Sequence, residues 1–294
     1  MIPGLSIGTI LAIEEAFAQR ALDNYISELK IYEHSKELLA GALSERREKT
    51  VPILHTPTME TPFVKVRNRF EMMNGKYSAG TVAIIPVSGV MRVDGGPSSF
   101  GISDTTEWLL AANSNPTIDG VVLEINSGGG EAYAGQMLRS AVDQMTKPVV
   151  SFVHFGASAA YLVAAGTNEI WASGAFAQVG SIGAMMVFSK QALAQVSEDA
   201  VFLIGKDSPN KNRDLLAAVQ GDFSGMQETV DKMTAQFQKN VVKSRNLDTS
   251  IPEVAESVKG GMYFAAQAKS LGLLDGIGTL QTAMNRVNKL KRKY

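Results

Sequence analysis

Ser158 has the surroundings that a nucleophilic hydroxyl needs. It follows an apolar run over residues 148–153, which predicts a strand, and it precedes a run of strong helix formers over 159–165. A hydroxyl at such a junction lies near the positive end of the helix dipole, and the neighbouring alanines are too small to cover it. The same pattern is typical of a helix N-cap, whose hydroxyl accepts a backbone N–H bond. The local sequence therefore indicates a candidate nucleophile with a structural alternative.

A glycine triplet supplies the second chemical feature. Residues 120–125 read as a buried strand, Gly128-Gly129-Gly130 follow it, and a helix is predicted from 131 to 145. Consecutive glycines let the chain turn sharply and bring backbone N–H groups close to a bound group, so this turn can hold an oxyanion. A tight turn from strand to helix without a ligand is the alternative. The spacings of the two common glycine-rich phosphate-binding motifs are not met.

The third feature is Lys211, which lies in the polar segment 208–213 directly after a strand-like run over 200–204. A lysine acts as general base to a serine only when it is neutral, so its pKa must fall by a few units from about 10.4 through burial or a nearby cation. Arg213 would supply part of that effect if the fold brings it close. A solvated loop lysine is the alternative interpretation.

Five sequence blocks, in order, resemble the S49 serine peptidases, the family that includes bacterial signal peptide peptidases and phage prohead proteases. The resemblance covers Val82 to about Thr279, roughly two thirds of the chain. The blocks are VAIIPVSG at 82–89, LEINSGGG at 123–130, ASAAY at 157–161, VGSIG at 179–183, and YFAAQA at 263–268 continuing to GLLD at 272–275.

This resemblance implies a ClpP/crotonase-like layered α/β fold that carries a Ser-Lys dyad. Ser158 would be the nucleophile and Lys211 the general base, preferred to Lys206 because 208–211 is similar to the lysine segment of soluble and phage-type members. The backbone N–H groups of Gly129 and Gly130 would form the oxyanion hole. The implied reaction is peptide-bond hydrolysis through an acyl-enzyme, without metal or cofactor.

The chain departs from the family pattern at two places. It has Ala159-Ala160 where members often have two glycines after the nucleophile, and Gly128 where they often have proline. Alanine is still small enough to leave the hydroxyl open, and glycine in place of proline removes no donor. These changes bear on cleavage preference more than on activity, and we expect small or apolar side chains beside the cleaved bond.

The resemblance also implies assembly and a biological setting. S49 relatives form homo-oligomeric rings, and in some the serine and lysine of one site come from adjacent subunits, so the sequence leaves the origin of the lysine open. The favoured setting is a phage-type capsid maturation protease acting on capsid or scaffold polypeptides, in the cytoplasm or within a prohead. The alternatives are signal-peptide or general peptide degradation, a crotonase-like acyl-CoA enzyme, and an inactive scaffold of the same fold.

Composition excludes several other chemistries. The 294 residues contain no cysteine and three histidines and carry a net charge of −1, so a disulfide framework, a zinc centre and default nucleic-acid binding are not indicated. No histidine follows Ser158, which disfavours a Ser-His-Asp triad, and His154 is expected to be a packed or edge residue. The apolar stretch 2–13 is short and ends at Glu14, so neither a secretion signal nor a membrane span is expected.

The pattern along the chain divides it near residue 75. Residues 1–75 are expected to form an N-terminal helical extension and linker: the helical part runs to about residue 50, with Leu11 and Ala12 in its apolar stripe, and an extended linker covers 49–62. Residues 76–294 are expected to form the peptidase domain, with a loop over 91–103 that orders on substrate binding. Strands are predicted near 82–90, 119–125, 148–154, 169–172, 182–188 and 200–204, and helices near 104–113, 131–145 and 158–166 and from a cap at Ser224 onward.

Overall fold

A computed structural model of the chain describes residues 10–13, 51–57, 63–95, 100–188, 193 and 201–292. Most of the N-terminal helical extension predicted over 1–75, and residues 96–99 of the predicted loop, lie outside the described residues. For residues 10–13 the structure gives the course of the backbone.

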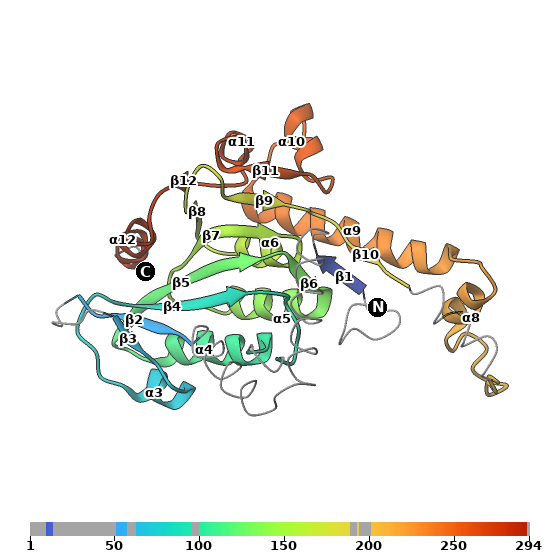
Figure 1. The fold of residues 1–294 in the computed structure, drawn as a ribbon, viewed down its shortest axis with the longest axis horizontal. Coiled ribbons are helices and arrows are strands. Elements are labelled where there is room, and N and C mark those ends of the chain that lie inside the picture. The colour runs from blue at the N-terminus through green and yellow to red at the C-terminus, as the bar shows by residue number, and fades with distance from the viewer. Residues whose placement is uncertain are drawn as a thin grey trace, which may run out of the picture.

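A nine-stranded sheet forms the centre of the molecule (Figure 1). Its main path runs in the order β11-β9-β7-β5-β4-β2-β3, and β8 adds to β7 and to β12. The strands β4, β5, β7, β8 and β9 are parallel to their neighbours among this group. The bounds are β2 Ile53–His55, β3 Phe63–Lys65, β4 Thr81–Ser88, β5 Ile118–Ser127, β7 Val149–Ala157, β8 Glu169–Ala172, β9 Gln178–Gly180, β11 Met262–Phe264 and β12 Gly276–Ile277.

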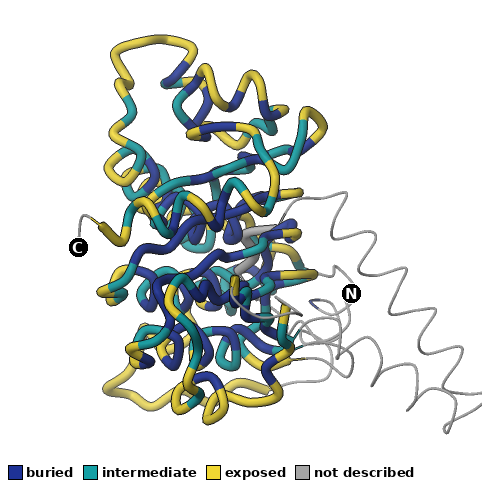
Figure 2. Tube along the Cα trace, turned by 90° about the vertical axis from the view of Figure 1, so that its left-hand side faces the viewer, coloured by how far each residue is buried: buried dark blue, intermediate teal, exposed yellow. Residues whose placement is uncertain are grey.

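Helices cover both faces of the sheet, which explains why its central strands are apolar along almost their whole length. Alternate residues of β4 divide between two cores: Ile85 packs with residues of α4 (Ile102–Ser114), α5 (Ala132–Asp143) and α6 (Ala159–Ala164), whereas Ile84 packs with α12 (Leu280–Lys291). Figure 2 shows that buried chain is concentrated in the middle of the molecule and exposed chain towards its top and bottom. The expected layered α/β fold is confirmed.

The remaining helices lie around this centre. The long α9 runs past α6 and ends near α10 and α11, while α8 lies at the opposite end of α9 (Figure 1). Their bounds are α3 Arg69–Asn74, α8 Arg213–Val219, α9 Ser224–Arg245, α10 Pro252–Ser257 and α11 Ala265–Ser270. The predicted apolar stripe of α9 is partly confirmed, since Phe237 and Val241 are buried in the main core. Phe223, and not Ser224, is the N-cap, and the Asp222 carboxylate accepts the Ser224 N–H at 2.9 Å.

Two predicted strands differ from the structure. No continuous strand covers residues 182–188. Strand β9 ends at Gly180, the chain turns at Ser181, whose φ is 52°, and the short β10 (Met185–Met186) follows. The strand expected over 200–204 is wrong for the described part, since residues 201–204 are exposed and outside any strand. An apolar run forms a strand only where another strand is available to pair with it.

The N-terminal region also departs from the expected helix. Residues Ile10–Ile13 form strand β1, which joins β6 (Gly129–Glu131) and β10 in a separate three-stranded sheet. Further along, β2 pairs with β4, so part of the segment expected to be a linker belongs to the central sheet. Leu54 is buried in the main core. A division of the chain at residue 75 stays a prediction.

A partly buried ion pair fixes α12 to the sheet and generates a stability prediction. Arg286 Nε donates to Glu169 Oε2 at 2.6 Å, and a second guanidinium nitrogen contacts the other carboxylate oxygen. Burial raises the pKa of Glu169, but the hydrogen bonds and charge of Arg286 outweigh it and hold this pKa below the ordinary glutamate value. The pair therefore stabilises the fold at pH values above the ordinary pKa of glutamate. This stabilisation is lost as the pH falls through the lowered pKa of Glu169.

We expect Arg286→Met to lower the free energy of unfolding by about 1–2 kcal/mol at neutral pH, and by much less at an acidic pH below the lowered pKa of Glu169. Urea denaturation followed by circular dichroism at the two pH values measures this difference. Lys239→Met removes the same charge from an exposed position on α9 and should change little. An equal loss for Arg286→Met at both pH values would contradict the role given to the ion pair.

Candidate active site

The carboxyl ends of the parallel strands β4, β5 and β7 bring three loop segments together at one edge of the sheet. The segment after β4 reaches the segment after β5 through two backbone hydrogen bonds. Met91 N–H donates to the Gly129 carbonyl at 2.8 Å, and Glu131 N–H donates to the Met91 carbonyl at 2.8 Å. These bonds form a parallel bridge between Met91 and Gly130, which fixes the glycine segment against its neighbour.

The glycines at this bridge are there because the backbones come very close. A Cβ added to Gly130 would lie 2.0 Å from the Met91 carbonyl oxygen. Gly129 has a φ of 91°, a conformation that favours glycine. The sequence pattern thus reflects a close approach between two segments, as well as a sharp turn.

Ser127 links the glycine segment to the turn at Gly89. Its buried hydroxyl donates to the Gly89 carbonyl at 2.6 Å and accepts the Gly129 N–H at 3.1 Å. The Gly129 N–H is therefore already used inside the chain. The bridge to Met91 uses the Gly129 carbonyl and the Glu131 N–H, which lie on one edge of the glycine segment. The Gly130 N–H therefore points away from Met91, toward the opposite edge of this segment. Sequence reasoning missed the role of Ser127, although the serine is part of the resembling block.

Ser158 lies where β7 becomes α6, as the sequence predicted for a strand-to-helix junction. Its φ and ψ are 55° and −122°, an uncommon conformation for a residue with a side chain, and it is 1% exposed. The hydroxyl does not cap α6, so the N-cap alternative is not what holds it. Ser158 Oγ has the Gly183 carbonyl at 3.5 Å, and Ser158 N–H donates to the Gly180 carbonyl at 2.9 Å.

The turn that receives Ser158 is itself held by close backbone contacts. Gly180 has a φ of 137°, and a Cβ there would lie 2.1 Å from the Gly261 carbonyl oxygen. The same carbonyl accepts the Ser181 N–H at 2.8 Å. The block at 179–183 therefore forms a backbone support for the serine. Local sequence gave no signal for this supporting role, because it depends on a contact with a segment about eighty residues further along the chain.

A contact between two helices couples the glycine segment to the serine. A Cβ at Gly135 of α5 would lie 2.8 Å from the Ala159 Cβ, so the two helices meet with almost no side chain between them. Because α5 follows Glu131 and α6 follows Ser158, this contact brings the glycine segment beside the candidate nucleophile. It also places the Ala159 N–H at the start of α6, a donor that sequence reasoning did not consider.

A mainly apolar cavity of about 290 Å³ opens between α5, α6 and α9. Ala159 and Ala184 line it, so it begins next to Ser158 and next to Gly183. The other lining side chains are Ala132, Tyr133, Gln136, Leu162, Met233, Gln236, Phe237 and Asn240. Its size and lining suit an apolar side chain of a bound molecule.

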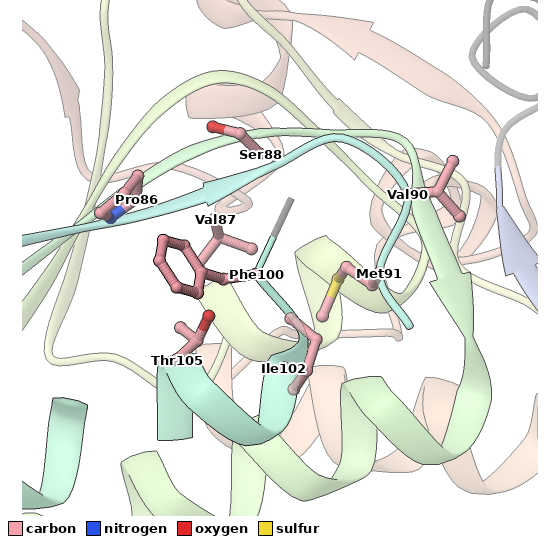
Figure 3. A pocket seen from close by; sticks show the side chains of 8 residues that line it. All are labelled: Pro86, Val87, Ser88, Val90, Met91, Phe100, Ile102 and Thr105. Carbon is pink, nitrogen blue, oxygen red and sulfur yellow. The ribbon is translucent and has the colours of Figure 1, made fainter. Parts of the chain in front are cut away.

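A second, smaller crevice lies behind Met91 (Figure 3). The side chains of Val87, Met91, Phe100 and Ile102 converge on it, whereas Val90 points away. Its volume is about 20 Å³, room for little more than one water molecule. The crevice is therefore too small for a substrate, and the side chains around it pack against Met91.

Lys211 lies apart from Ser158 in the described chain. It is exposed, in the turn before α8, and Figure 1 shows α8 at the end of α9 that is remote from the β7–α6 junction. Lys206 lies in the same exposed segment. Among the described residues, no hydrogen bond or ion pair joins either lysine to Ser158. The structure thus brings the start of α6, directly after Ser158, against β6, which holds Gly129 and Gly130, and leaves the predicted base elsewhere.

His154 lies on β7 and pairs with Glu124 of β5, with Nε2 and Oε1 3.0 Å apart. Its ring packs against Phe152, which belongs to the core under α12, so it faces the opposite side of the sheet from α6. Within the described ranges, His, Asp and Glu side chains form no group of three that could hold a metal ion. No helix in these ranges is both long enough and apolar enough to cross a membrane.

Comparisons with known proteins identify the family of the chain. The family model described as Peptidase family S49 matches residues 141–293, more than half of the chain. The chain therefore belongs to peptidase family S49. The matched region contains Ser158, Lys211 and the turn at Gly180.

Three curated relatives show the extent of the similarity. A putative protease of Methanocaldococcus jannaschii is 27% identical over 59% of this chain and 57% of its own length, and a putative signal peptide peptidase SppA of Enterococcus faecium is 27% identical over 63% and 54%. Protease 4 of Salmonella typhi is 25% identical over 73% of this chain and 35% of its own length. The chain thus matches between about a third and three fifths of these relatives. A solved structure of a ClpP1 mutant from Listeria monocytogenes matches with a TM-score of 0.44 and 11% identity, over 68% of this chain and 94% of that one.

Proposed function

We propose that the protein is a serine endopeptidase that hydrolyses peptide bonds with Ser158 as nucleophile and Lys211 as general base. The observation that carries the proposal is the placement of Ser158. Its hydroxyl makes no capping bond, its backbone is held in an uncommon conformation, and the helix that follows it contacts β6, which holds Gly129 and Gly130. A strained turn that presents a serine between a strand and a helix is a recurrent way to build a nucleophile. Membership of family S49 supports the same chemistry.

The oxyanion that forms during attack would be held by backbone donors. Gly130 N–H is the first donor, because the Gly129 N–H already donates to Ser127 Oγ. Gly129 would contribute if that bond is exchanged, and the Ala159 N–H, which follows the nucleophile, is positioned to be a further donor. Donors fixed by the backbone need no reorganisation when negative charge develops, which is the basis of their catalytic effect.

The reaction begins when the neutral Lys211 amine accepts the Ser158 proton as Ser158 Oγ attacks the peptide carbonyl carbon. The tetrahedral intermediate then breaks its C–N bond, and the ammonium returns the proton to the leaving amine. Water attacks the resulting ester with the lysine again as base, and this step releases the acid and regenerates the serine hydroxyl. No metal or cofactor is needed for these steps.

We propose that the lysine reaches the serine from a second copy of the chain. The segment that leads to Lys211 is unusually apolar for an exposed region: Val201 is 89% exposed and Leu203 94% exposed, and Phe202 and Ile204 are also exposed. A continuous exposed apolar segment indicates a surface that another protein covers. Assembly of copies that buries residues 201–204 would bring Lys211 to a neighbouring Ser158 and would dehydrate it.

The cavity between α5, α6 and α9 supports a preference for apolar side chains beside the cleaved bond. Ala159, directly after the nucleophile, lines it together with Leu162 and Phe237. A substrate side chain entering from Ser158 would exchange water for apolar contacts. For the biological setting we propose maturation of a phage-type capsid, based on the resemblance of residues 208–211 to that branch, with peptide degradation as the alternative.

A fluorophosphonate probe tests the nucleophile. We expect the probe to label the wild-type chain, and Ser158→Ala to lose the label because the reactive hydroxyl is absent. The matched control is Ser151→Ala, which removes another buried strand serine that bonds Thr167 and lies away from the site. Mass spectrometry of the labelled peptide identifies the modified residue. Equal labelling of both variants would assign the reactive hydroxyl to another residue, and no labelling of the assembled wild-type protein would favour an inactive scaffold.

Mixing two inactive variants tests the origin of the lysine. Ser158→Ala and Lys211→Ala should each lose activity by orders of magnitude. If neighbouring copies supply the two groups, mixed assemblies at equal amounts regain about a quarter of the wild-type sites, because half the serines and half the lysines are intact. Peptide hydrolysis after mixing and reassembly gives the measurement. No recovery in assemblies shown to be mixed would place both groups in one chain.

Filling the cavity tests the substrate preference. Ala184→Leu adds bulk to the cavity wall, so kcat/KM for peptides with a large apolar side chain before the cleaved bond should fall about tenfold or more. Peptides with alanine at that position should lose much less. Ala235→Leu makes the same change at an exposed position of α9 that does not line the cavity. A uniform loss for both peptides would show that the cavity does not receive this side chain.

A further inference from the structure

The chain's own strand β1 lies in the gap between β6 and β10 (Figure 1). It is antiparallel to both strands. On one side Leu11 pairs with Glu131, Ala12 with Gly130 and Ile13 with Gly129. On the other side Ile10 pairs with Met186 and Leu11 with Met185. A segment far from the site in sequence thus completes a three-stranded sheet with the glycine segment.

The edge of β6 that β1 uses is the edge that carries the Gly130 N–H, the donor that the Met91 bridge does not use. The Met91 bridge consumes the Gly129 carbonyl and the Glu131 N–H on the other edge. The Gly130 N–H and carbonyl therefore face Ala12, which is their register partner. The donor that we assign to the oxyanion is the one at which β1 is paired.

The second edge of the gap also adjoins the nucleophile. The Gly183 carbonyl lies 3.5 Å from Ser158 Oγ, and β10 begins two residues later at Met185. The cavity for an apolar side chain is lined by Ala132, directly after β6, and by Ala184, directly before β10. Ser158, the donor and the cavity therefore all border the gap that β1 fills.

We propose that this gap is the groove in which substrate binds as an added strand, antiparallel to β6, and that Ile10–Ile13 is a built-in occupant that competes with substrate. The proposal rests on the proposed peptidase function. An extended peptide placed between two strand edges gains backbone hydrogen bonds on both sides whatever its sequence, which suits an endopeptidase. The register places the residue before the cleaved bond opposite Gly130, where Ala12 now lies. A groove that its own chain occupies binds substrate with an affinity reduced by the occupied fraction.

Peptide binding to variants of β1 tests the competition without requiring catalysis. The chain carries Ser158→Ala, and the probe is a fluorescein-labelled peptide with the sequence of residues 8–15, GTILAIEE. Ala12→Pro removes an N–H that the ladder needs and should expel the strand. Ala12→Ser keeps the N–H and serves as the matched control.

We expect fluorescence anisotropy to show that the peptide binds about tenfold more tightly to Ala12→Pro than to Ala12→Ser. This ratio corresponds to a groove that β1 leaves open in about a tenth of the Ala12→Ser molecules. The double variant Leu11→Pro/Ala12→Pro should bind at least as tightly. Equal thermal unfolding of the variants checks that the fold is intact. Equal affinities for the proline and serine variants, or no binding to an intact proline variant, would overturn the proposal.

The outcome is separable from that of the proposed function. Tighter binding to Ala12→Pro, with no hydrolysis and no probe labelling in chains that retain Ser158, would keep the groove and reject the peptidase. Hydrolysis by chains that retain Ser158, with the same KM for Ala12→Pro and Ala12→Ser, would keep the peptidase and reject the built-in occupant.

Discussion

The backbone conformation of Ser158 is the constraint on which the rest of the site depends. A residue with a side chain in an uncommon region of φ and ψ costs about 1–3 kcal/mol, so the surrounding structure must hold it. Three features do so: the β7 ladder up to Ala157, the start of α6 at Ala159, and the bond from the Ser158 N–H to the Gly180 carbonyl. Because the serine is fixed by backbone contacts on each side, its hydroxyl needs no side-chain partner of its own for placement. That leaves it available for reaction.

Close backbone approaches extend this rigidity to the oxyanion donors. At Gly130 the neighbour is the Met91 carbonyl, at Gly135 it is Ala159, and at Gly180 it is the Gly261 carbonyl. In each case any larger residue would push two segments apart. The site is therefore built mostly from main-chain atoms, and side chains enter mainly as supports such as Ser127. This construction suits the proposed binding of substrate through its own main chain, and it agrees with the proposal that the cavity lined by Ala159 and Ala184 selects the substrate side chain.

The sequence predicted the elements that depend on neighbouring residues. The strands at β4, β5, β7 and β8, the helices that follow β5 and β7, and Ser158 at its junction all follow from local patterns of apolar and small residues. Contacts between distant segments could not be read in this way. The bonds of Ser127 Oγ to Gly89 and Gly129 require β4 to lie beside β5. Leu11 and Ala12 belong to a helical spacing of residues along the N-terminal region, but pairing with the edges of β6 and β10 overrides that local preference.

Lys211 was identified by resemblance to a family motif, and its exposure in one chain shows why local sequence cannot place it. In the single chain, no hydrogen bond or ion pair among the described residues joins Lys211 to Ser158, so the proposed proton transfer between them cannot take place there. Under the proposed function, an isolated chain is then inactive for two independent reasons: the base is absent from Ser158, and strand β1 fills the groove. Burial of residues 201–204 between copies would bring the proposed base to Ser158. It would not remove β1 from the groove, since β1 pairs with β6 and β10 and not with that segment. Assembly and release of the strand are therefore separate requirements, and a chain freed of β1 but unable to assemble should bind peptide without cleaving it.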